Sequence, residues 1–135
     1  MIASQWEEEL VAEWLAIKGY LIETNVPIGA GRGGGRREAD IIAVKLDDDK
    51  IHIMHVEVAS FAEGPIKAVP RYKSKFYWGE KYIKERWSIK RSIKREINLE
   101  KLIVGTWVSD NMRKAIEREL PNVKLLTFKT LMEKE

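Results

Sequence analysis

Two apolar runs joined by a short polar turn constrain the fold of this chain more than any other feature. The first run covers residues 40–46, the second covers residues 51–59, and Asp47-Asp48-Asp49-Lys50 lies between them. Apolar runs of this length, bounded by turn residues, are typical of strands. A connection this short predicts an antiparallel hairpin. We therefore expect a sheet that contains this hairpin.

Each of the two predicted strands carries an acidic residue. Asp40 opens the first strand, and Glu57 lies inside the second. Carboxylates are uncommon in strands and costly to bury, so each needs a compensating partner. Strand alternation puts His55, Glu57 and Ala59 on one face, and the hairpin can bring Asp40 close to Glu57. Carboxylate oxygens suit Mg²⁺ or Mn²⁺, so the pair predicts a metal site.

The first twenty residues predict a helix that offers a third carboxylate. Ser4 and Glu7 have the spacing of a capping box, and Gly19 ends the helical pattern. Apolar residues recur between them at helical spacing: Trp6, Leu10, Trp14 and Ile17. Glu8 lies at the edge of the buried face, because Val11, Ala12 and Leu15 follow it at helical spacing. Glu8 is therefore a candidate metal ligand; its alternative role is a favourable charge at a helix N-terminus.

The remaining elements complete an α/β pattern. We expect a strand at residues 20–26 that Pro27 ends, a flexible loop at 29–37, one or two helices after Pro65 with Pro70 as a start or kink, a strand at 102–108, a helix from Ser109 or Asp110 to Leu120, a strand at 123–128 and a helix at 129–135. The order α-β-β-β-α-β-α-β-α implies one domain, residues 1–135. It has a mixed sheet of about five strands flanked by helices.

Charge and composition narrow the classes of partner. The net charge is +3, but residues 67–95 hold eleven Lys or Arg and two Glu. This excess favours a nucleic-acid partner. The absence of Cys excludes thiolate metal sites and disulfides. The acidic N-terminus is unlike a signal peptide and no apolar run approaches a membrane span, so we expect a cytoplasmic protein. Many charged residues with few Asn and Gln are typical of heat-adapted proteins.

The ordered combination of these features resembles the PD-(D/E)XK nuclease superfamily, and within it the small archaeal Holliday junction resolvases. The matching features are Glu8 on the helix, the Gly31–Arg37 loop, Asp40 at a strand start, the polar turn, and Glu57 between apolar residues. The likeness covers the first half of the chain by motif and the second half by element order. It implies a restriction-endonuclease-like core.

The resemblance also implies a role for each matched residue. Glu8, Asp40 and Glu57 would bind one or two Mg²⁺ ions, which polarise the scissile phosphate and lower the pKa of an attacking water. The family usually carries a lysine two residues after the strand glutamate, but Ala59 stands there in this chain. We expect Lys67 to supply the missing charge as a catalytic residue. Further candidates are Lys73, Arg36 and Arg37.

These features together predict a Mg²⁺- or Mn²⁺-dependent DNA endonuclease. By analogy with the resolvases, it would act on double-stranded, branched or otherwise structured DNA and work as a homodimer. The expected DNA contacts are Arg32, Arg36, Arg37, Lys67, Arg71, Lys73 and Lys75. His55 could carry a proton for the reaction, although a plain hydrogen-bonded role is commoner for a strand histidine. Two alternatives stay open: a catalytically inactive nuclease fold that binds DNA, and a protein-interaction domain with a basic face.

Overall fold

Helices and strands follow one another along the chain in the order that the sequence predicts. The computed structural model describes residues 2–30, 36–47, 49–59, 64–88 and 96–133, with side chains for all of these except residues 2–5, 30, 36, 37 and 88. The elements are α1 (Ile2–Ile17), β1 (Leu21–Ala30), β2 (Arg36–Leu46), β3 (Lys50–Ala59), α2 (Pro65–Ser88), β4 (Glu96–Gly105), α3 (Asp110–Glu119), β5 (Val123–Thr127) and α4 (Phe128–Glu133). The predicted α/β class is therefore confirmed.

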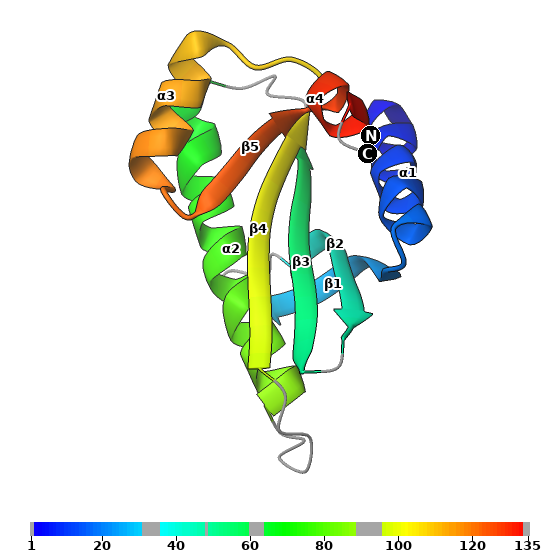
Figure 1. Ribbon diagram of the computed structural model, residues 1–135. Coiled ribbons are helices and arrows are strands. Elements are labelled where there is room, and N and C mark those ends of the chain that lie inside the picture. Colours follow the sequence, from blue (N-terminus) through cyan, green and yellow to red (C-terminus); the bar gives the residue numbers. More distant parts are fainter. Residues whose placement is uncertain (1, 31–35, 48, 60–63, 89–95, 134–135) are drawn as a thin grey trace.

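A mixed sheet of five strands organises the described part of the chain (Figure 1). The strands lie in chain order from β1 to β5, antiparallel from β1 to β3 and parallel from β3 to β5. The Asp47 amide donates to the Lys50 carbonyl at 2.9 Å, which closes the predicted β2–β3 hairpin. Parallel neighbours need crossover connections, and α2 and α3 provide them.

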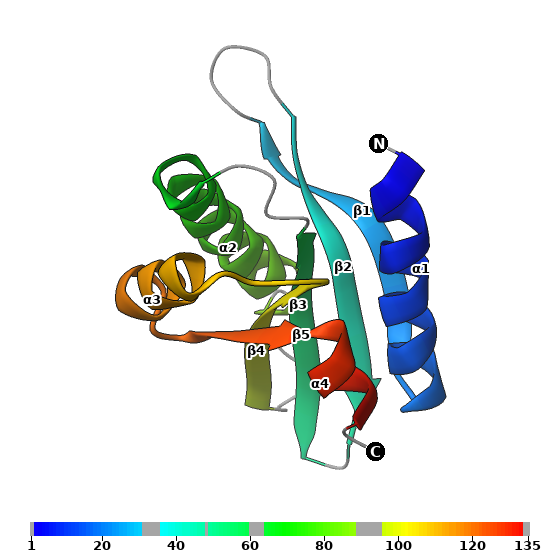
Figure 2. The ribbon, with the colours of Figure 1, turned by 90° about the horizontal axis from the view of Figure 1, so that it is seen from above.

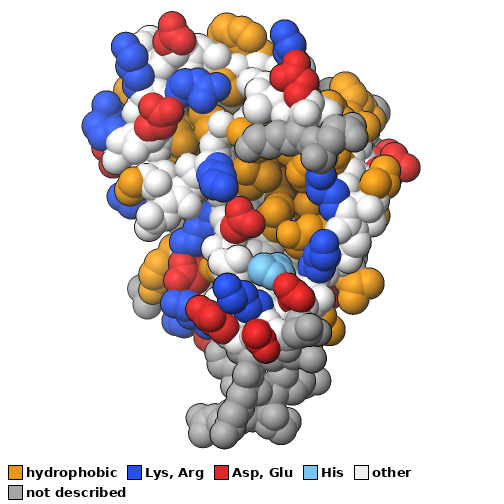
Figure 3. Space-filling view, viewed as in Figure 1, with side chains coloured by type: hydrophobic (Ala, Val, Ile, Leu, Met, Phe, Trp, Pro, Cys, Tyr) orange, Lys and Arg blue, Asp and Glu red, His pale blue; other side chains and the backbone are white. Residues whose placement is uncertain are grey.

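Helices cover both faces of the sheet (Figure 2): α1 and α4 lie on one side, α2 and α3 on the other. Val11, Leu15 and Leu131 are fully buried against the first face. The last five residues of β3 are all buried, because both faces are covered there. On the α1 side Met54 and Leu126 are only partly buried, and Figure 3 shows an apolar area among charged side chains over the centre of this face. Within the described part of the chain, no helix is both long enough and apolar enough to span a membrane.

The buried stripe of α1 differs from the predicted one. Trp6 is 57% exposed and Ile17 is 85% exposed, whereas Val11 and Leu15 are completely buried. The sheet contacts the side of the helix that carries Val11 and Leu15, the residues that the sequence analysis placed beside Glu8 on the buried face. The prediction was therefore wrong for the two ends of the stripe, Trp6 and Ile17, and right for Trp14, which packs against the core.

The ends of α1 were predicted with unequal success. The helix begins at Ile2, so Ser4 lies within its first turn and the predicted capping box was wrong. The C-terminal end is as predicted: Gly19 has φ +95°, and the Tyr20 amide donates to the Leu15 carbonyl at 3.1 Å. A glycine in the left-handed region is a common way to end a helix.

Several strands and α2 have boundaries that the sequence did not predict. Strand β1 continues through Pro27 with a register shift, because an edge strand tolerates a residue without an amide hydrogen. Strand β2 begins at Arg36, so Asp40 lies inside the strand and not at its start. Helix α2 is one continuous helix with Pro70 inside it. Strand β4 ends at Gly105, before the predicted end at Val108.

Candidate active site

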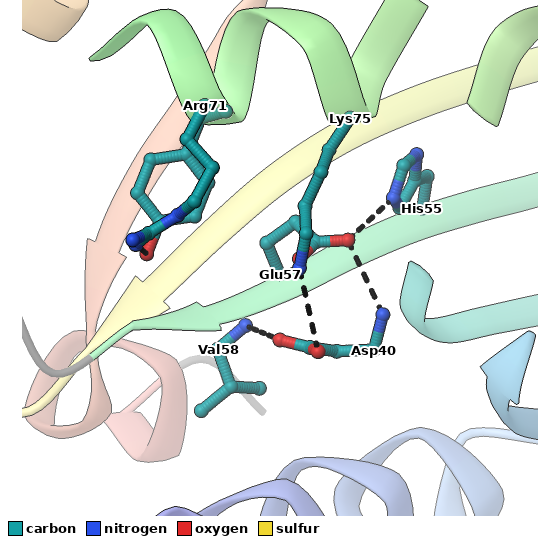
Figure 4. A network of polar contacts seen from close by, with 7 residues as sticks. Asp40, His55, Glu57, Val58, Arg71 and Lys75 are labelled. Atoms are coloured by element: carbon teal, nitrogen blue, oxygen red, sulfur yellow. Dashed lines mark hydrogen bonds and ion pairs between the residues drawn. The ribbon is translucent and has the colours of Figure 1, made fainter. Parts of the chain in front are cut away.

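The backbone ladder between β2 and β3 gives way to carboxylate hydrogen bonds at one end. The last backbone pair is Ile41 opposite Val56. Beyond it, the Asp40 amide donates to Oε2 of Glu57 at 3.2 Å, and the Val58 amide donates to Oδ2 of Asp40 at 2.8 Å. The two strands are therefore joined here through the side chains of both acids (Figure 4). The hairpin brings Asp40 and Glu57 together, as the sequence predicts.

Glu57 is a completely buried carboxylate with a partner on each oxygen. His55 Nε2 lies 2.7 Å from Oε2, and Lys75 Nζ donates to Oε1 at 3.0 Å. Burial by itself would raise the pKa of Glu57, but the contacts with His55 and Lys75 outweigh it and hold the pKa below its usual value. Glu57 is therefore a carboxylate that remains ionised inside the protein.

Lys75 is the cation of the site. Its Nζ lies 3.0 Å from Glu57 Oε1 and 4.0 Å from Asp40 Oδ1, and its side chain is 23% exposed. Burial acts to lower the pKa of Lys75, but the negative charges of Glu57 and Asp40 raise it above its usual value. Figure 4 shows the amine reaching from α2 to the two acids on the sheet.

Asp40 has a pKa far above the usual value of an aspartate. Burial, followed by the negative charge of Glu57, raises its pKa from 3.8 to about 7. Lys75 and the hydrogen bond from the Val58 amide act in the opposite direction. Asp40 therefore gains or loses its proton near neutral pH, while Glu57 stays charged.

The amine that contacts Asp40 and Glu57 belongs to Lys75 and not to Lys67, which was predicted for this role. Lys67 and Lys73 are both exposed, and no ion pair joins either of them to Asp40 or Glu57 in the part of the chain that the structure describes. Lys75 was expected only as a DNA contact. Lys75 follows Tyr72 by three residues and precedes Gly79 by four, which puts it on the buried side of α2, but the burial of these two residues is known only from the structure.

Ala59, where the resemblance leads one to expect lysine, is part of the core. It is 2% exposed and belongs to the same buried cluster as Ala68 and Tyr72 of α2. The small side chain at this position lets the helix pack close to β3. The close packing in turn brings the Lys75 amine within reach of Glu57.

Glu8 and Glu7 of α1 take different positions near the site. Glu8 is half-buried; burial and the charge of Glu57 raise its pKa, while Lys75 lowers it. Glu7 is buried and accepts a hydrogen bond from the Thr106 hydroxyl, a link between α1 and the end of β4 that the sequence did not indicate. No three acidic, His or Cys side chains among the described residues lie close enough together to hold a metal ion.

The predicted DNA contacts are distributed unevenly over the structure. Lys67, Arg71 and Lys73 are exposed on α2. Lys73 lies 4.0 Å from Glu119 of α3, and Arg71 donates to the Tyr72 hydroxyl at 3.3 Å. The other predicted contacts were Arg32, which lies outside the described residues, and Arg36 and Arg37, whose backbone belongs to β2 and whose side chains are not described.

Comparisons with known proteins add one structural likeness. No protein-family model matches the chain, and no curated protein matches it. The chain is similar to the crystal structure of a protein of unknown function, AF1548, with 14% sequence identity and a TM-score of 0.49. The match covers 94% of this chain, which spans 64% of the length of that protein. The chemistry of the candidate site therefore has to be judged from its own side chains.

Proposed function

We propose that this protein is a metal-dependent endonuclease that hydrolyses phosphodiester bonds in DNA. The observation that carries the proposal is the Lys75 amine, 3.0 Å from Glu57 and 4.0 Å from Asp40. Two carboxylates can hold a divalent cation, and an adjacent ammonium can face a phosphate. Phosphoryl transfer depends on this kind of placement and charge stabilisation. Lys75 would thus do the work of the lysine that is absent at Ala59.

Two carboxylate oxygens, Oε1 of Glu57 and Oδ1 of Asp40, converge at Lys75, and the same pair fits a hard cation. Oε2 of Glu57 and Oδ2 of Asp40 accept hydrogen bonds within the fold, whereas Oε1 and Oδ1 both face Lys75. Mg²⁺ commonly takes one or two carboxylates together with water and substrate phosphate, so a three-residue cluster is not required. Mn²⁺ accepts the same ligands. When bound, the ion would polarise the scissile phosphate and lower the pKa of an attacking water.

Glu8 remains the predicted third ligand, although in this structure it does not lie close enough to Asp40 and Glu57 to share an ion with them. It lies close enough for its charge to raise the pKa of Asp40, and Glu57 in turn raises the pKa of Glu8. Carboxylates that repel one another in this way gain most from a shared cation. The raised pKa values of Glu8 and Asp40 therefore support a site whose negative charges a bound cation would stabilise.

Lys75 would act on the phosphate or on the attacking water. Its raised pKa keeps a proton on Nζ at neutral pH. The ammonium can then donate hydrogen bonds to a phosphate oxygen and offset the negative charge that builds up there. Because Lys75 comes from α2, while Asp40 and Glu57 come from the sheet, packing between helix and sheet would control this geometry.

Helix α2 is the proposed DNA-binding element. It carries seven Lys or Arg and two Glu, and a surface of this kind neutralises backbone phosphates. Arg71 and Lys75 are four residues apart, and Figure 4 shows both extending from the same side of the helix toward the sheet. Lys67 and Lys73 add exposed charge to the same helix. Cutting both strands of a duplex would require two sites, so a homodimer is part of the proposal.

A second candidate function is DNA binding without cleavage. Asp40 and Glu57 already receive backbone amides, His55 and Lys75, and these contacts link β2, β3 and α2 without any ion. The same cluster could therefore serve the fold alone. Under this alternative, the basic residues of α2 would still bind DNA.

A cleavage assay with two matched lysine variants tests the proposed function. Purified protein with Mg²⁺ or Mn²⁺ is incubated with duplex, flapped and four-way DNA, and we expect nicks in at least one substrate. Lys75→Met should lower the cleavage rate by about 100-fold or more, the usual cost of losing one transition-state donor. Lys67→Met removes the same charge from an exposed position on the same helix and should leave the rate within a few-fold. Asp40→Asn should abolish cleavage but leave DNA binding.

The outcomes separate the candidate functions. Cleavage that is equally impaired in Lys67→Met and Lys75→Met would contradict the role given to Lys75. Binding that weakens steeply with salt, without cleavage in either metal, would favour the non-catalytic alternative. No salt-dependent binding to any DNA would leave the protein-interaction domain as the remaining hypothesis.

A further inference from the structure

His55 is an imidazole enclosed between β3 and α2. It is 1% exposed, and its ring centroid lies 4.6 Å from that of Phe76. Gly79 of α2 faces the ring so closely that a Cβ at this position would lie 2.4 Å from its Cε1 and Nδ1 atoms. The helix therefore rests directly on the imidazole, one turn along from Lys75.

The two nitrogens of this ring have very different surroundings. Nε2 lies 2.7 Å from Oε2 of Glu57, a carboxylate that is 0% exposed. Nδ1 is buried and has no hydrogen-bond partner among the described residues. A buried N–H without an acceptor is more costly than an unpaired acceptor, so the proton belongs on Nε2, where Glu57 can accept it. In this tautomer Nδ1 is an acceptor without a partner among the described residues, and the Nε2 hydrogen points at Glu57.

His55 and the Asp40 amide both contact the same oxygen of Glu57, Oε2, and leave Oε1 to Lys75. Two donors on Oε2 fix the plane of the carboxylate. Oε1 therefore stays directed at the place where Asp40 Oδ1 and Lys75 Nζ converge.

We propose that His55 is a positioning residue, which holds Oε2 of Glu57 so that Oε1 is directed at the place where the proposed metal ion would bind. This role rests on the proposed function, since the oxygen that it aims is the proposed metal ligand. Outer hydrogen bonds to ligating carboxylates are a general feature of metal sites, and their loss commonly costs 10-fold to 100-fold in metal affinity or activity. His55 is a better candidate for such a role than for acid-base chemistry, because it is enclosed.

The competing explanation is that His55 only fills space between β3 and α2. Two substitutions distinguish packing from hydrogen bonding. His55→Phe keeps a ring against Phe76 but has no donor for Glu57. His55→Gln keeps an N–H near the position of Nε2 but loses the ring. Positioning predicts that Phe is the damaging variant, and packing predicts that Gln is.

The first measurement is the Mg²⁺ dependence of DNA cleavage in the wild type and both variants. We expect His55→Phe to raise the Mg²⁺ concentration for half-maximal rate by 10-fold to 100-fold. His55→Gln should stay within a few-fold of the wild type. Denaturant unfolding confirms that each variant is folded. If the Phe variant does not fold, His55→Met, which also lacks a donor, replaces it.

The second measurement needs no cleavage. Mn²⁺ added to ¹⁵N-labelled protein broadens NMR signals close to a bound ion, and we expect half-maximal broadening to shift to 10-fold to 100-fold higher Mn²⁺ in His55→Phe only. A wild type that binds Mn²⁺ at this site but cuts no DNA would refute the proposed function and leave the role of His55 intact. The same Mn²⁺ response in all three proteins would overturn the positioning role. No Mn²⁺ binding by the wild type would overturn both.

Discussion

Asp40→Asn should change how the stability of this protein depends on pH. Burial and the charge of Glu57 raise the pKa of Asp40 from 3.8 to about 7 in the folded protein. Between these two values the folded protein keeps the proton on Asp40, whereas the unfolded chain releases it. This proton therefore favours the folded state below about pH 4, and the contribution is lost as the pH rises through 7. Asparagine does not titrate, so the stability of the variant does not fall with pH for this reason.

The size of the effect follows from the interval between the two pKa values. Each pH unit in that interval is worth about 1.4 kcal/mol, so the whole interval from 3.8 to about 7 is worth about 4 kcal/mol. Asp40 is 18% exposed, which keeps solvent screening small. Between pH 5 and pH 8, the free energy of unfolding of Asp40→Asn should rise relative to the wild type by about 3 kcal/mol.

Urea unfolding of both proteins in EDTA at pH 5, 6, 7 and 8 measures this difference directly. Titrations that the two proteins share cancel in the subtraction, and any constant cost of the asparagine appears as an offset without a slope. Asp49→Asn is the matched control, because Asp49 is exposed in the β2–β3 turn. Its difference from the wild type should stay constant with pH.

The result that would refute this reasoning is a pH-independent difference between Asp40→Asn and the wild type. It would mean that Lys75 compensates Asp40 fully and that the carboxylate is ionised throughout this range. A difference that falls with pH would mean that the pKa of Asp40 is lowered in the folded protein, the opposite of the raised value.

Three further predictions test the packing and the metal site. Leu15→Ala should lower the free energy of unfolding by about 2–5 kcal/mol, because Leu15 is fully buried. Ile17→Ala should change it by less than about 0.5 kcal/mol, because Ile17 is 85% exposed. Equal effects of the two substitutions would contradict the observed buried face of α1. Gly79→Ala should lower the free energy of unfolding by about 1–3 kcal/mol, because the added Cβ forces α2 away from His55. Gly64→Ala, with nothing within 4 Å of its Cβ, should lower it by less than about 1 kcal/mol. The denaturant midpoints of the two variants measure this difference. Millimolar Mg²⁺ should raise the melting temperature of the wild type more at pH 8 than at pH 5, because Asp40 binds the ion only when its carboxylate is ionised. The melting temperature of Asp40→Asn should not change with Mg²⁺. Scanning fluorimetry in EDTA and in Mg²⁺ gives the comparison.

The predictable part of this fold is local. Apolar runs, polar turns and a helix-ending glycine predicted the order of elements and the β2–β3 hairpin, because strand and helix periods are properties of short segments. Boundaries failed where a distant neighbour decides them. Pro27 is tolerated in β1 because that strand lies at the sheet edge, and β2 extends back to Arg36 because β1 continues alongside it.

The candidate site divides in the same way. Strand alternation and the hairpin are enough to bring Asp40 and Glu57 together. The cation could not be read from spacing alone, because Lys67, Lys73 and Lys75 all lie on one basic helix. Which of them reaches the acids depends on the rotation and distance of α2 relative to the sheet.

The sequence by itself therefore determined the elements, their order and the pairing of two acids across a hairpin, since each depends on neighbours in the chain. Only the tertiary structure decided that Lys75 is the amine of the site and that His55 holds Glu57. Both depend on the close contact of α2 with β3, which small residues at Ala59 and Gly79 permit. This contact is set by packing between elements that are distant in sequence, and the periodicity of short segments does not predict it.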